Sequence, residues 1–245
     1  GAPLVPFFDY LQYRHRSRGR VVLNIGGIAN ITVIPSNARP GAVIAFDTGP
    51  GNMVIDQLVF NMTKGRVKFD AGGKRSAAGT IDESLLKKIL REPYFAHRPP
   101  KSTGREMYGP HFLRHWFPVA PNATEQEKYS TLATATALTA ATIVQAIQRF
   151  ALPLGDFHEV LVSGGGVKNS FLMDQIQARM EVIASAASPL RICSLESAPI
   201  PSEAKEAAAF ALLAYQTKLG IPSNLPSVTG ATRQVVLGKL VSLGK

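Results

Sequence analysis

The chain contains very little cysteine. Cys193 is the single cysteine in 245 residues, so an internal disulfide framework is excluded and a reducing compartment is expected. Long apolar runs are missing too, since none approaches the ~20 residues that a membrane span needs, and the first residues lack the layout of a signal peptide. We therefore expect a cytoplasmic protein with no membrane partner.

Metal-binding patterns are also absent from the sequence. The five histidines are His15, His97, His111, His115 and His158. His111 and His115 are separated by one helical turn, but no third ligand accompanies them, as a zinc site would need. The sequence therefore predicts no dedicated metal cage.

Acidic residues are few relative to basic ones. The chain has 17 acidic and 27 basic residues, a formal net charge of +10, which raises the question of nucleic acid or an acidic membrane surface. The basic residues cluster once, at Arg14–Arg20, in an expected exposed turn that no recognised nucleic-acid module surrounds. We interpret this cluster as a solvated loop, with contact to a polyanion as the less favoured alternative.

The chain begins with Gly-Ala-Pro in place of Met and leads directly into an apolar segment, Leu4–Leu11. A natural N-terminus usually begins with residues that the fold can spare. We therefore expect a fragment of a longer protein. Its 45% hydrophobic content is still enough for a substantial core.

Glycine-rich turns follow apolar, strand-like runs. Strands are expected at Val21–Ile25 and Ile28–Ile34, joined by the Gly26-Gly27 turn, and a third at Ala42–Phe46, which leads into the turn Asp47–Asn52. Glycine leaves backbone N–H groups unhindered at the end of a strand, where an anion can approach. This arrangement suits a phosphate.

A further glycine-rich turn, Ser163–Gly166, lies far downstream. It follows an expected buried strand, His158–Val162, and precedes an expected helix, Lys168–Met180, whose N-terminal dipole faces the turn. Such turns at several strand ends are hard to explain as ordinary loops.

The remaining segments are mostly helical. A helix begins near Gly51-Asn52 and carries Asp56, which we interpret as a partnered structural residue in preference to a catalytic one. Thr124–Phe150 is expected to be a long helix with Thr124 as its N-cap, and its many small residues indicate close packing. A last helix is expected at Ser202–Thr217.

The order of these elements predicts an α/β fold. With a further strand at Leu190–Ser194, the chain gives a mixed sheet with helices on both faces, whose ligands bind at the carboxyl ends of the strands. Between them, the Pro-Pro-led loop Pro99–Glu106 presents polar and charged side chains together, as a site for a polar ligand would. A plain surface loop is nearly as good an interpretation.

These motifs, taken in order, resemble those of the anhydro-N-acetylmuramic acid kinases. The segments that carry the resemblance are GAPLVP at 1–6, NIGGIANIT at 24–32, FDTGPGNMVID at 46–56, PPKSTGRE at 99–106, SGGGVKN at 163–169, EAAAFALLA at 206–214 and PSNLPSVTGA at 222–231. The resemblance extends over nearly the whole chain. It implies the C-terminal lobe, 1–245, of a two-lobed actin-like ATPase (ribonuclease H-like) fold, with an inserted helical and loop region at about 64–121 and with the N-terminal lobe missing.

The resemblance also implies an activity. Family members are implied to use ATP and water to open the 1,6-anhydro ring of a cell-wall-derived amino sugar while phosphorylating O6, with Mg²⁺ held mainly by phosphates and water. The implied partners are ATP, the anhydro amino sugar and the missing lobe, and a homodimer is left open.

The site residues follow from the motifs. The nucleotide side is implied to use Gly26, Gly27, Asn30, Gly164, Gly165, Gly166 and Asn169. The cleft near the transferred phosphate is implied to use Asp47, Thr48, Gly49, Gly51 and Asn52. The sugar side is implied to use Lys101, Ser102, Thr103, Arg105 and Glu206.

Parts of the family pattern are absent. The first phosphate loop and the aspartate upstream of GAPLVP, the implied general base, are not in the chain, and Asp9 lies in the wrong motif to replace that base. The chain alone is therefore predicted to be inactive. Phe69–Gly72 has lost one acid of an aromatic-Asp-x-Asp pattern and Arg75 replaces a tryptophan, which leaves the exact sugar open. The alternative is a non-catalytic nucleotide- or sugar-binding module.

Overall fold

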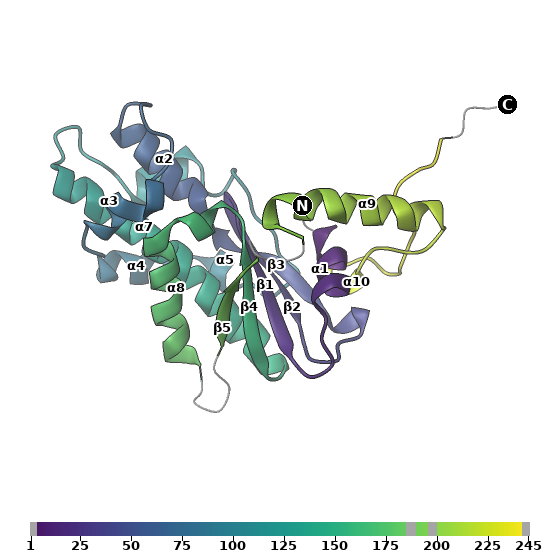
Figure 1. Ribbon diagram of the computed structural model, residues 1–245. Coiled ribbons are helices and arrows are strands. Elements are labelled where there is room, and N and C mark those ends of the chain that lie inside the picture. The colour runs from purple at the N-terminus through teal and green to yellow at the C-terminus, as the bar shows by residue number, and fades with distance from the viewer. Residues whose placement is uncertain (1–3, 185–189, 196–199, 242–245) are drawn as a thin grey trace.

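A five-stranded mixed sheet forms the centre of the protein (Figure 1). The structure is a computed structural model and describes residues 4–184, 190–195 and 200–241. The strands are β1 (Gly19–Ile25), β2 (Ile28–Ile34), β3 (Ile44–Pro50), β4 (Phe157–Ser163) and β5 (Arg191–Ser194), in the order β3-β2-β1-β4-β5. β2 is antiparallel to β1 and β3, whereas β4 is parallel to β1 and β5.

Helices cover both faces of this sheet. Their bounds are α1 (Val5–Tyr13), α2 (Asn52–Met62), α3 (Lys74–Ala77), α4 (Glu83–Ile89), α5 (Pro93–Ala96), α6 (Pro110–Trp116), α7 (Glu125–Ala146), α8 (Ser170–Ile183), α9 (Lys205–Lys218) and α10 (Pro226–Thr229). The mixed sheet with helices on both faces is the expected α/β architecture, and its strand order is ribonuclease H-like. The expected fold class is therefore confirmed.

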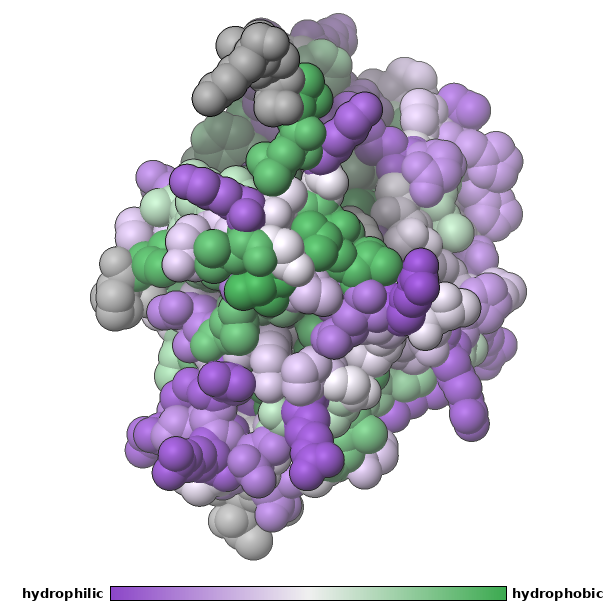
Figure 2. All heavy atoms as spheres, turned by 90° about the vertical axis from the view of Figure 1, so that its right-hand side faces the viewer, coloured by the Kyte–Doolittle hydropathy of each residue, from purple (hydrophilic) through white to green (hydrophobic). Residues whose placement is uncertain are grey.

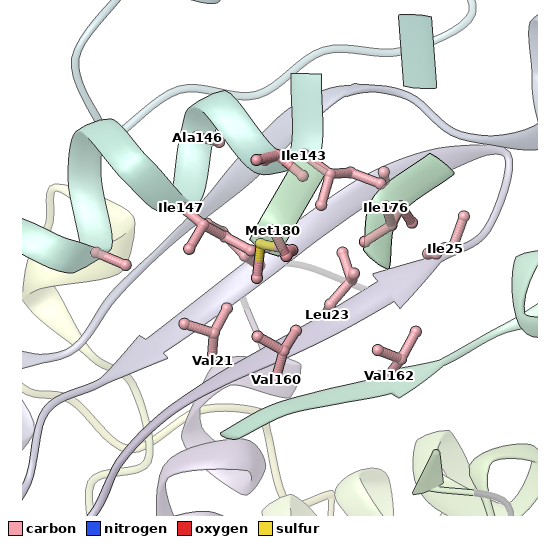
Figure 3. Close-up of a cluster of buried hydrophobic side chains, with 14 of the residues drawn as sticks. Val21, Leu23, Ile25, Ile143, Ala146, Ile147, Val160, Val162, Ile176 and Met180 are labelled. Carbon is pink, nitrogen blue, oxygen red and sulfur yellow. The ribbon is translucent and has the colours of Figure 1, made fainter. Parts of the chain in front are cut away.

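Alternation along the strands divides the core between the two faces. Val21, Leu23 and Ile25 of β1 pack with α7 and α8, as Figure 3 shows around Ile143 and Met180. The intervening Val22 lies in a second cluster with α1, α9 and α10. Side chains two residues apart on a strand share a face, so β1 anchors both helical layers. A third cluster joins α2, α4 and α6 to α7.

Helix α7 is the central helix of the fold. The Thr124 hydroxyl accepts the Glu127 N–H, and the Glu127 carboxylate accepts from Thr124, which completes a capping box. The small residues from Ala133 to Ala141 are all buried, so the packing interpretation is confirmed. The helical stretch Glu125–Leu154 is long and apolar enough to cross a membrane, contrary to the expectation that no segment is, but 83% of its most apolar window is buried inside the protein.

Several element boundaries differ from the expected ones. β3 runs from Ile44 to Pro50 instead of ending at Phe46, because Asp47, Gly49 and Pro50 continue to pair with β2. Helix α8 begins at Ser170, with the Asn169 side chain accepting the Leu172 N–H as its cap, and not at Lys168. The apolar segment near the N-terminus is helix α1.

The basic cluster is only partly a solvated loop. β1 already begins at Gly19, and Arg18 and Arg20 form ion pairs of 2.7 and 2.6 Å with Glu159 of the neighbouring strand β4. Those two arginines therefore help to fix the β1–β4 pairing, which the turn interpretation missed.

A buried ion pair fastens α9 to the sheet. Lys205 Nζ lies 2.7 Å from Asp9 Oδ1 of α1, and the Thr32 hydroxyl of β2 donates to Asp9 Oδ2 at 3.0 Å. Burial raises the pKa of Asp9, and Lys205 opposes that shift. Asp9 is thus engaged in structural contacts.

Candidate functional site

A row of polar residues crosses one end of the sheet. Asp47 of β3 is paired with Asn30 of β2, Asn30 with Asn24 of β1, and Asn24 with Ser163 of β4. On each strand, the polar residue lies an even number of positions from a side chain of the cluster that packs against α1 and α9. Asn24, for example, lies two positions after Val22. The four side chains therefore share that face of the sheet.

Asn24 is a member of this row that sequence reasoning missed. A Cβ placed on Gly164 would lie 2.7 Å from Asn24 Oδ1, and one placed on Gly26 would lie 3.7 Å from Asn24 Nδ2. The Asn24 amide is thus located between the two glycine turns, and it is partly exposed. The sequence could have indicated this residue, because Asn24 comes directly before Ile25-Gly26-Gly27 and lies two positions after Val22, on the same face of the strand.

The N-terminus of α2 supports the hairpin turn. The N–H groups of Gly51 and Asn52 donate to the carbonyls of Gly27 and Gly26 at 2.9 and 2.8 Å, and the Met53 N–H also donates to the Gly27 carbonyl. The first N–H groups of a helix need such acceptors. The expectation that Gly51 and Asn52 offer free N–H groups to an anion is therefore wrong.

Two further cleft residues are tied into strand β3. The Thr48 hydroxyl donates to the Ala29 carbonyl at 3.2 Å, and Thr48 is buried. A Cβ on Gly49 would lie 3.0 to 3.2 Å from Phe95 and Thr142, so this glycine allows α7 to approach the strand. Both residues lie in a strand and not in the expected loop.

The glycines of the downstream turn have different roles. A Cβ on Gly166 would lie 2.3 Å from Ile25 Cγ2, and Gly164 has a φ of +90° with the Ile25 carbonyl 2.7 Å from its Cβ position. These two glycines are required by the approach of β1. Gly165 is exposed, and its nearest neighbour would be Asn52 Nδ2 at 3.8 Å. Only Gly165 of the three leaves an open surface for a ligand.

The Gly26-Gly27 turn is similarly open. A Cβ on Gly27 would meet nothing closer than Met53 Cε at 3.5 Å, and Gly27 is exposed. Backbone at this turn and at Gly165 is therefore accessible to a ligand at the same end of the sheet.

A pocket of about 270 Å³ adjoins Gly165. It is lined by Asn52, Asp56, Phe69, Asp70, Gly72, Gly165, Lys168 and Asn169. The pocket thus brings together Gly165 and Asn169 from the nucleotide group with Asn52 from the cleft group. The pocket also contains residues that the motifs did not indicate. Three of them come from the altered segment at 69–72, namely Phe69, Asp70 and Gly72, and Lys168 comes from the turn before α8.

Two carboxylates shape the electrostatics of this pocket. Asp70 is buried and accepts from the N–H groups of Arg75 and Ser76 and from the Ser76 hydroxyl. Burial, and then the charge of Asp70, raise the pKa of Asp56 to about 6. Among the described residues Asp56 has no hydrogen-bond or ion-pair partner, contrary to its interpretation as a partnered residue.

The loop at 99–106 is bonded to strand β3. The Thr103 N–H donates to Asp47 Oδ2 at 2.9 Å, the Asp47 N–H donates to the Lys101 carbonyl at 3.3 Å, and the Tyr94 hydroxyl donates to the Asp47 carbonyl at 2.7 Å. Burial raises the pKa of Asp47, against the effect of the Thr103 N–H. The loop therefore joins the cleft group to the sugar group.

Lys101 lies in an aromatic cage on the same edge. Its Nζ donates to the Tyr94 carbonyl at 3.0 Å and lies 4.6 to 5.5 Å from the ring centres of Tyr94, Phe46 and Phe150. Burial, and then Arg149, lower the pKa of Lys101 to about 8. Ser102 and Arg105 are exposed on the loop. Glu206 belongs to a separate element, the exposed side of the first turn of α9.

The candidate site combines neutral and charged groups at one end of the sheet. Open backbone at Gly27 and Gly165 and the Asn24 amide are neutral, whereas the adjoining pocket adds Asp56, Asp70 and Lys168. Among the described residues, no group of three His, Cys, Asp or Glu side chains could hold a metal ion.

Comparison with known proteins identifies relatives along nearly the whole chain. The family model "Anhydro-N-acetylmuramic acid kinase" matches residues 1–242. The chain is 40% identical over 240 residues to the protein of that description from Caldanaerobacter subterraneus subsp. tengcongensis, and 42% identical over 240 residues to that from Salinibacter ruber. These matches cover 98% of this chain but only 59% and 58% of the two relatives.

Solved structures match more distantly. The activator of the 2-hydroxyisocaproyl-CoA dehydratase from Clostridium difficile with bound ADPNP has a TM-score of 0.46 and 14% sequence identity, over 87% of this chain and 64% of that chain. The family assignment rests on the sequence matches and not on this likeness.

Proposed function

Because the chain belongs to the anhydro-N-acetylmuramic acid kinase family, we propose that it is the C-terminal lobe of a cytoplasmic kinase that opens the anhydro ring of 1,6-anhydro-N-acetylmuramic acid and phosphorylates O6. The observation that carries the proposal is the convergence of the two open glycine turns and the polar row at one end of the sheet. Phosphoryl transfer depends mainly on positioning and electrostatic stabilisation, which such an array of fixed donors can supply.

The nucleotide side is built on the two open turns. The pocket beside Gly165 is suited to the adenosine end, and the backbone at Gly27 to the phosphates, with the Asn24 amide between the two turns. Neutral N–H donors bind phosphate oxygens without the cost of burying an unpaired cation. ATP supplies the phosphoryl group, and Mg²⁺ neutralises part of its charge.

The sugar side is built on Asp47 and the loop at 99–106. The Thr103 N–H fixes one carboxylate oxygen of Asp47, which leaves the other to accept from a sugar hydroxyl or an ordered water. Arg105 is exposed on the same loop, and its positive charge suits an anionic, lactyl-bearing sugar.

The remainder of the site is proposed to come from a second lobe. The chain spans about 59% of the length of its first relative, and exposed apolar side chains follow α9: Phe210, Tyr215, Leu219 and Ile221. Figure 2 shows apolar groups gathered on this side of the molecule. Apolar patches of this kind usually mark an interface, and we assign this one to the missing lobe, with a homodimer as the alternative.

The test is an assay of a full-length parent protein with ATP and the anhydro sugar, with the 6-phosphorylated product detected by mass spectrometry. Asp47→Asn should lower kcat/KM at least ~10-fold because it removes a charged acceptor, whereas Asp174→Asn, a matched change on α8, should leave kcat/KM unaltered. Binding of nucleotide and sugar without any product would favour the alternative, a non-catalytic binding module.

A further inference from the structure

A second and larger pocket is lined by residues of α5, α6 and the loop at 99–106. Its volume is about 700 Å³, within the usual range for small-molecule sites. Tyr94 and Phe95 of α5 and Tyr108, Phe112 and Trp116 on and before α6 supply aromatic rings to its wall. We call it the aromatic pocket. None of the residues that line the nucleotide pocket belongs to it.

The polar groups of the aromatic pocket are mainly cationic or neutral. Lys101, His97, His111 and His115 line it, and Arg149 is close enough to act on the charge of Lys101. Glu92 is the one acidic side chain in the wall, and its carboxylate accepts from Trp116 Nε1 at 3.1 Å. Among the described residues, no carboxylate forms an ion pair with Lys101. The positive charge of Lys101 is therefore available to an anion.

The wall of the pocket is also bonded to Asp47. The Tyr94 hydroxyl and the Lys101 carbonyl both bond the Asp47 backbone, at 2.7 and 3.3 Å, and Tyr94 and Lys101 line the pocket. A molecule seated there would stabilise the arrangement that fixes the Asp47 carboxylate. Occupation of the pocket and the position of Asp47 are thus physically connected.

We infer that the aromatic pocket is a binding site for a small, flat ring compound that carries a carboxylate or sulfonate, separate from the nucleotide pocket. The ring contacts the aromatic wall and the acidic group pairs with Lys101. This inference extends beyond the proposed kinase activity and does not depend on it, since it concerns a cavity of the chain described here.

Trp116 allows a direct test because it is the single tryptophan of the chain and lines the pocket. The probe is 1-anilinonaphthalene-8-sulfonate, and the matched neutral probe is N-phenyl-1-naphthylamine, which lacks only the sulfonate. Binding of the sulfonate probe should produce energy transfer from Trp116. The sulfonate probe should also bind at least ~5-fold more tightly than the neutral probe, because a single charge-assisted contact gives a preference of this size. In Lys101→Met this preference should disappear, while the neutral probe should still bind.

Two control variants separate this site from other surfaces. Lys168→Met removes a lysine from the nucleotide pocket, and Phe210→Ser removes an exposed apolar group of α9; neither should change the preference for the sulfonate probe. Circular dichroism and a melting curve establish that Lys101→Met is folded. If Lys101→Met does not fold, the variant His115→Ala, at the rim of the pocket, is used instead and should weaken binding of the sulfonate probe.

Other outcomes would overturn the inference. An unchanged preference in a folded Lys101→Met variant would show that Lys101 does not recognise the anion. Probe fluorescence without energy transfer from Trp116, abolished by Phe210→Ser, would place the probe on α9. Displacement of the probe by the anhydro sugar would make the pocket part of the sugar site, and displacement by ATP would make it part of the nucleotide site.

Discussion

Gly165 and Gly166 are neighbours in the sequence, but a side chain would have opposite effects at the two positions. At Gly166 the added Cβ would overlap Ile25 at 2.3 Å, whereas at Gly165 the nearest atom would be 3.8 Å away. The same three-glycine motif therefore contains a packing position and an open one. A side chain at Gly166 should therefore disturb the fold, whereas a side chain at Gly165 should disturb ligand binding.

The first prediction compares the two substitutions. Gly165→Val should keep the melting temperature within a few degrees of the parent and abolish ATP binding, because the valine would occupy the surface that the nucleotide needs. Gly166→Val should unfold the chain or strongly lower its melting temperature, because the core beside β1 would be overpacked. Calorimetry with ATP and thermal melting provide the measurements. Undiminished ATP binding by Gly165→Val would remove this turn from the nucleotide site.

The second prediction concerns Asp56. Its pKa in the folded chain is raised to about 6, so the fold favours the protonated acid and stability falls as the pH rises from about 4 through about 6. Asp56→Asn avoids that penalty. The variant should be more stable by about 1–2 kcal/mol near neutral pH and equal to the parent near pH ~4, after allowance for partial exposure.

Urea denaturation at both pH values checks this expectation. Asp174→Asn, on α8, is the control, since its side chain is not in the pocket. Equal stability of Asp56→Asn and the parent near neutral pH would show that Asp56 is well solvated in the folded chain.

At the level of elements, a buried ion pair joins α9 to α1. Lys205 is 7% exposed and Asp9 is 3% exposed. If one of the two charges were removed, water could therefore not solvate the other. The same helix begins with Glu206, the acid implied on the sugar side. The buried pair therefore also sets the position of that acid relative to the sheet.

The third prediction removes one member of this pair. Lys205→Met should lower the free energy of unfolding by about 3–5 kcal/mol, because Asp9 would be left buried without its counter-charge. The double variant Asp9→Leu/Lys205→Met should recover much of that loss. Chemical denaturation of the parent, the single variant and the double variant measures both effects. A loss below ~1 kcal/mol for the single variant would mean that Asp9 takes up a proton or reaches water at little cost.

At the level of the whole molecule, the end of the sheet carries only part of the kinase site that we propose. The chain has the two open glycine turns, the polar row and the loop at 99–106, but not the first phosphate loop or the upstream aspartate that the resemblance implies. Its family relatives are longer, since the chain covers 59% of the first of them.

The fourth prediction is that this polypeptide alone has no measurable anhydro-sugar kinase activity and binds ATP weakly. Both follow from the resemblance, which implies that the general base and the first phosphate loop lie outside this sequence, so that only part of the phosphate contacts is present. Product formation is measured by mass spectrometry with the parent protein as the positive control. ATP-dependent turnover by the isolated chain that Asp47→Asn abolishes would contradict the prediction.

The sequence by itself determined the family, the fold class and most of the elements. Val21–Ile25, Ile28–Ile34 and the Thr124 cap are visible because local alternation, glycine turns and capping are properties of neighbouring residues. The motifs at Gly26-Gly27 and Gly164–Gly166 likewise indicated the strand ends at which the open turns lie.

Only the tertiary structure decided which of those residues are open to a ligand. The N–H groups of Gly51 and Asn52 are used by the carbonyls of the hairpin turn, and Gly166 is packed against Ile25, contacts that no local pattern reveals. For the same reason, Asn24 enters the candidate site, and Asp56 has no hydrogen-bond or ion-pair partner among the described residues. Strand register and helix packing set which groups meet across long separations in sequence, and those long-range contacts determine the burial, charge and accessibility of each side chain.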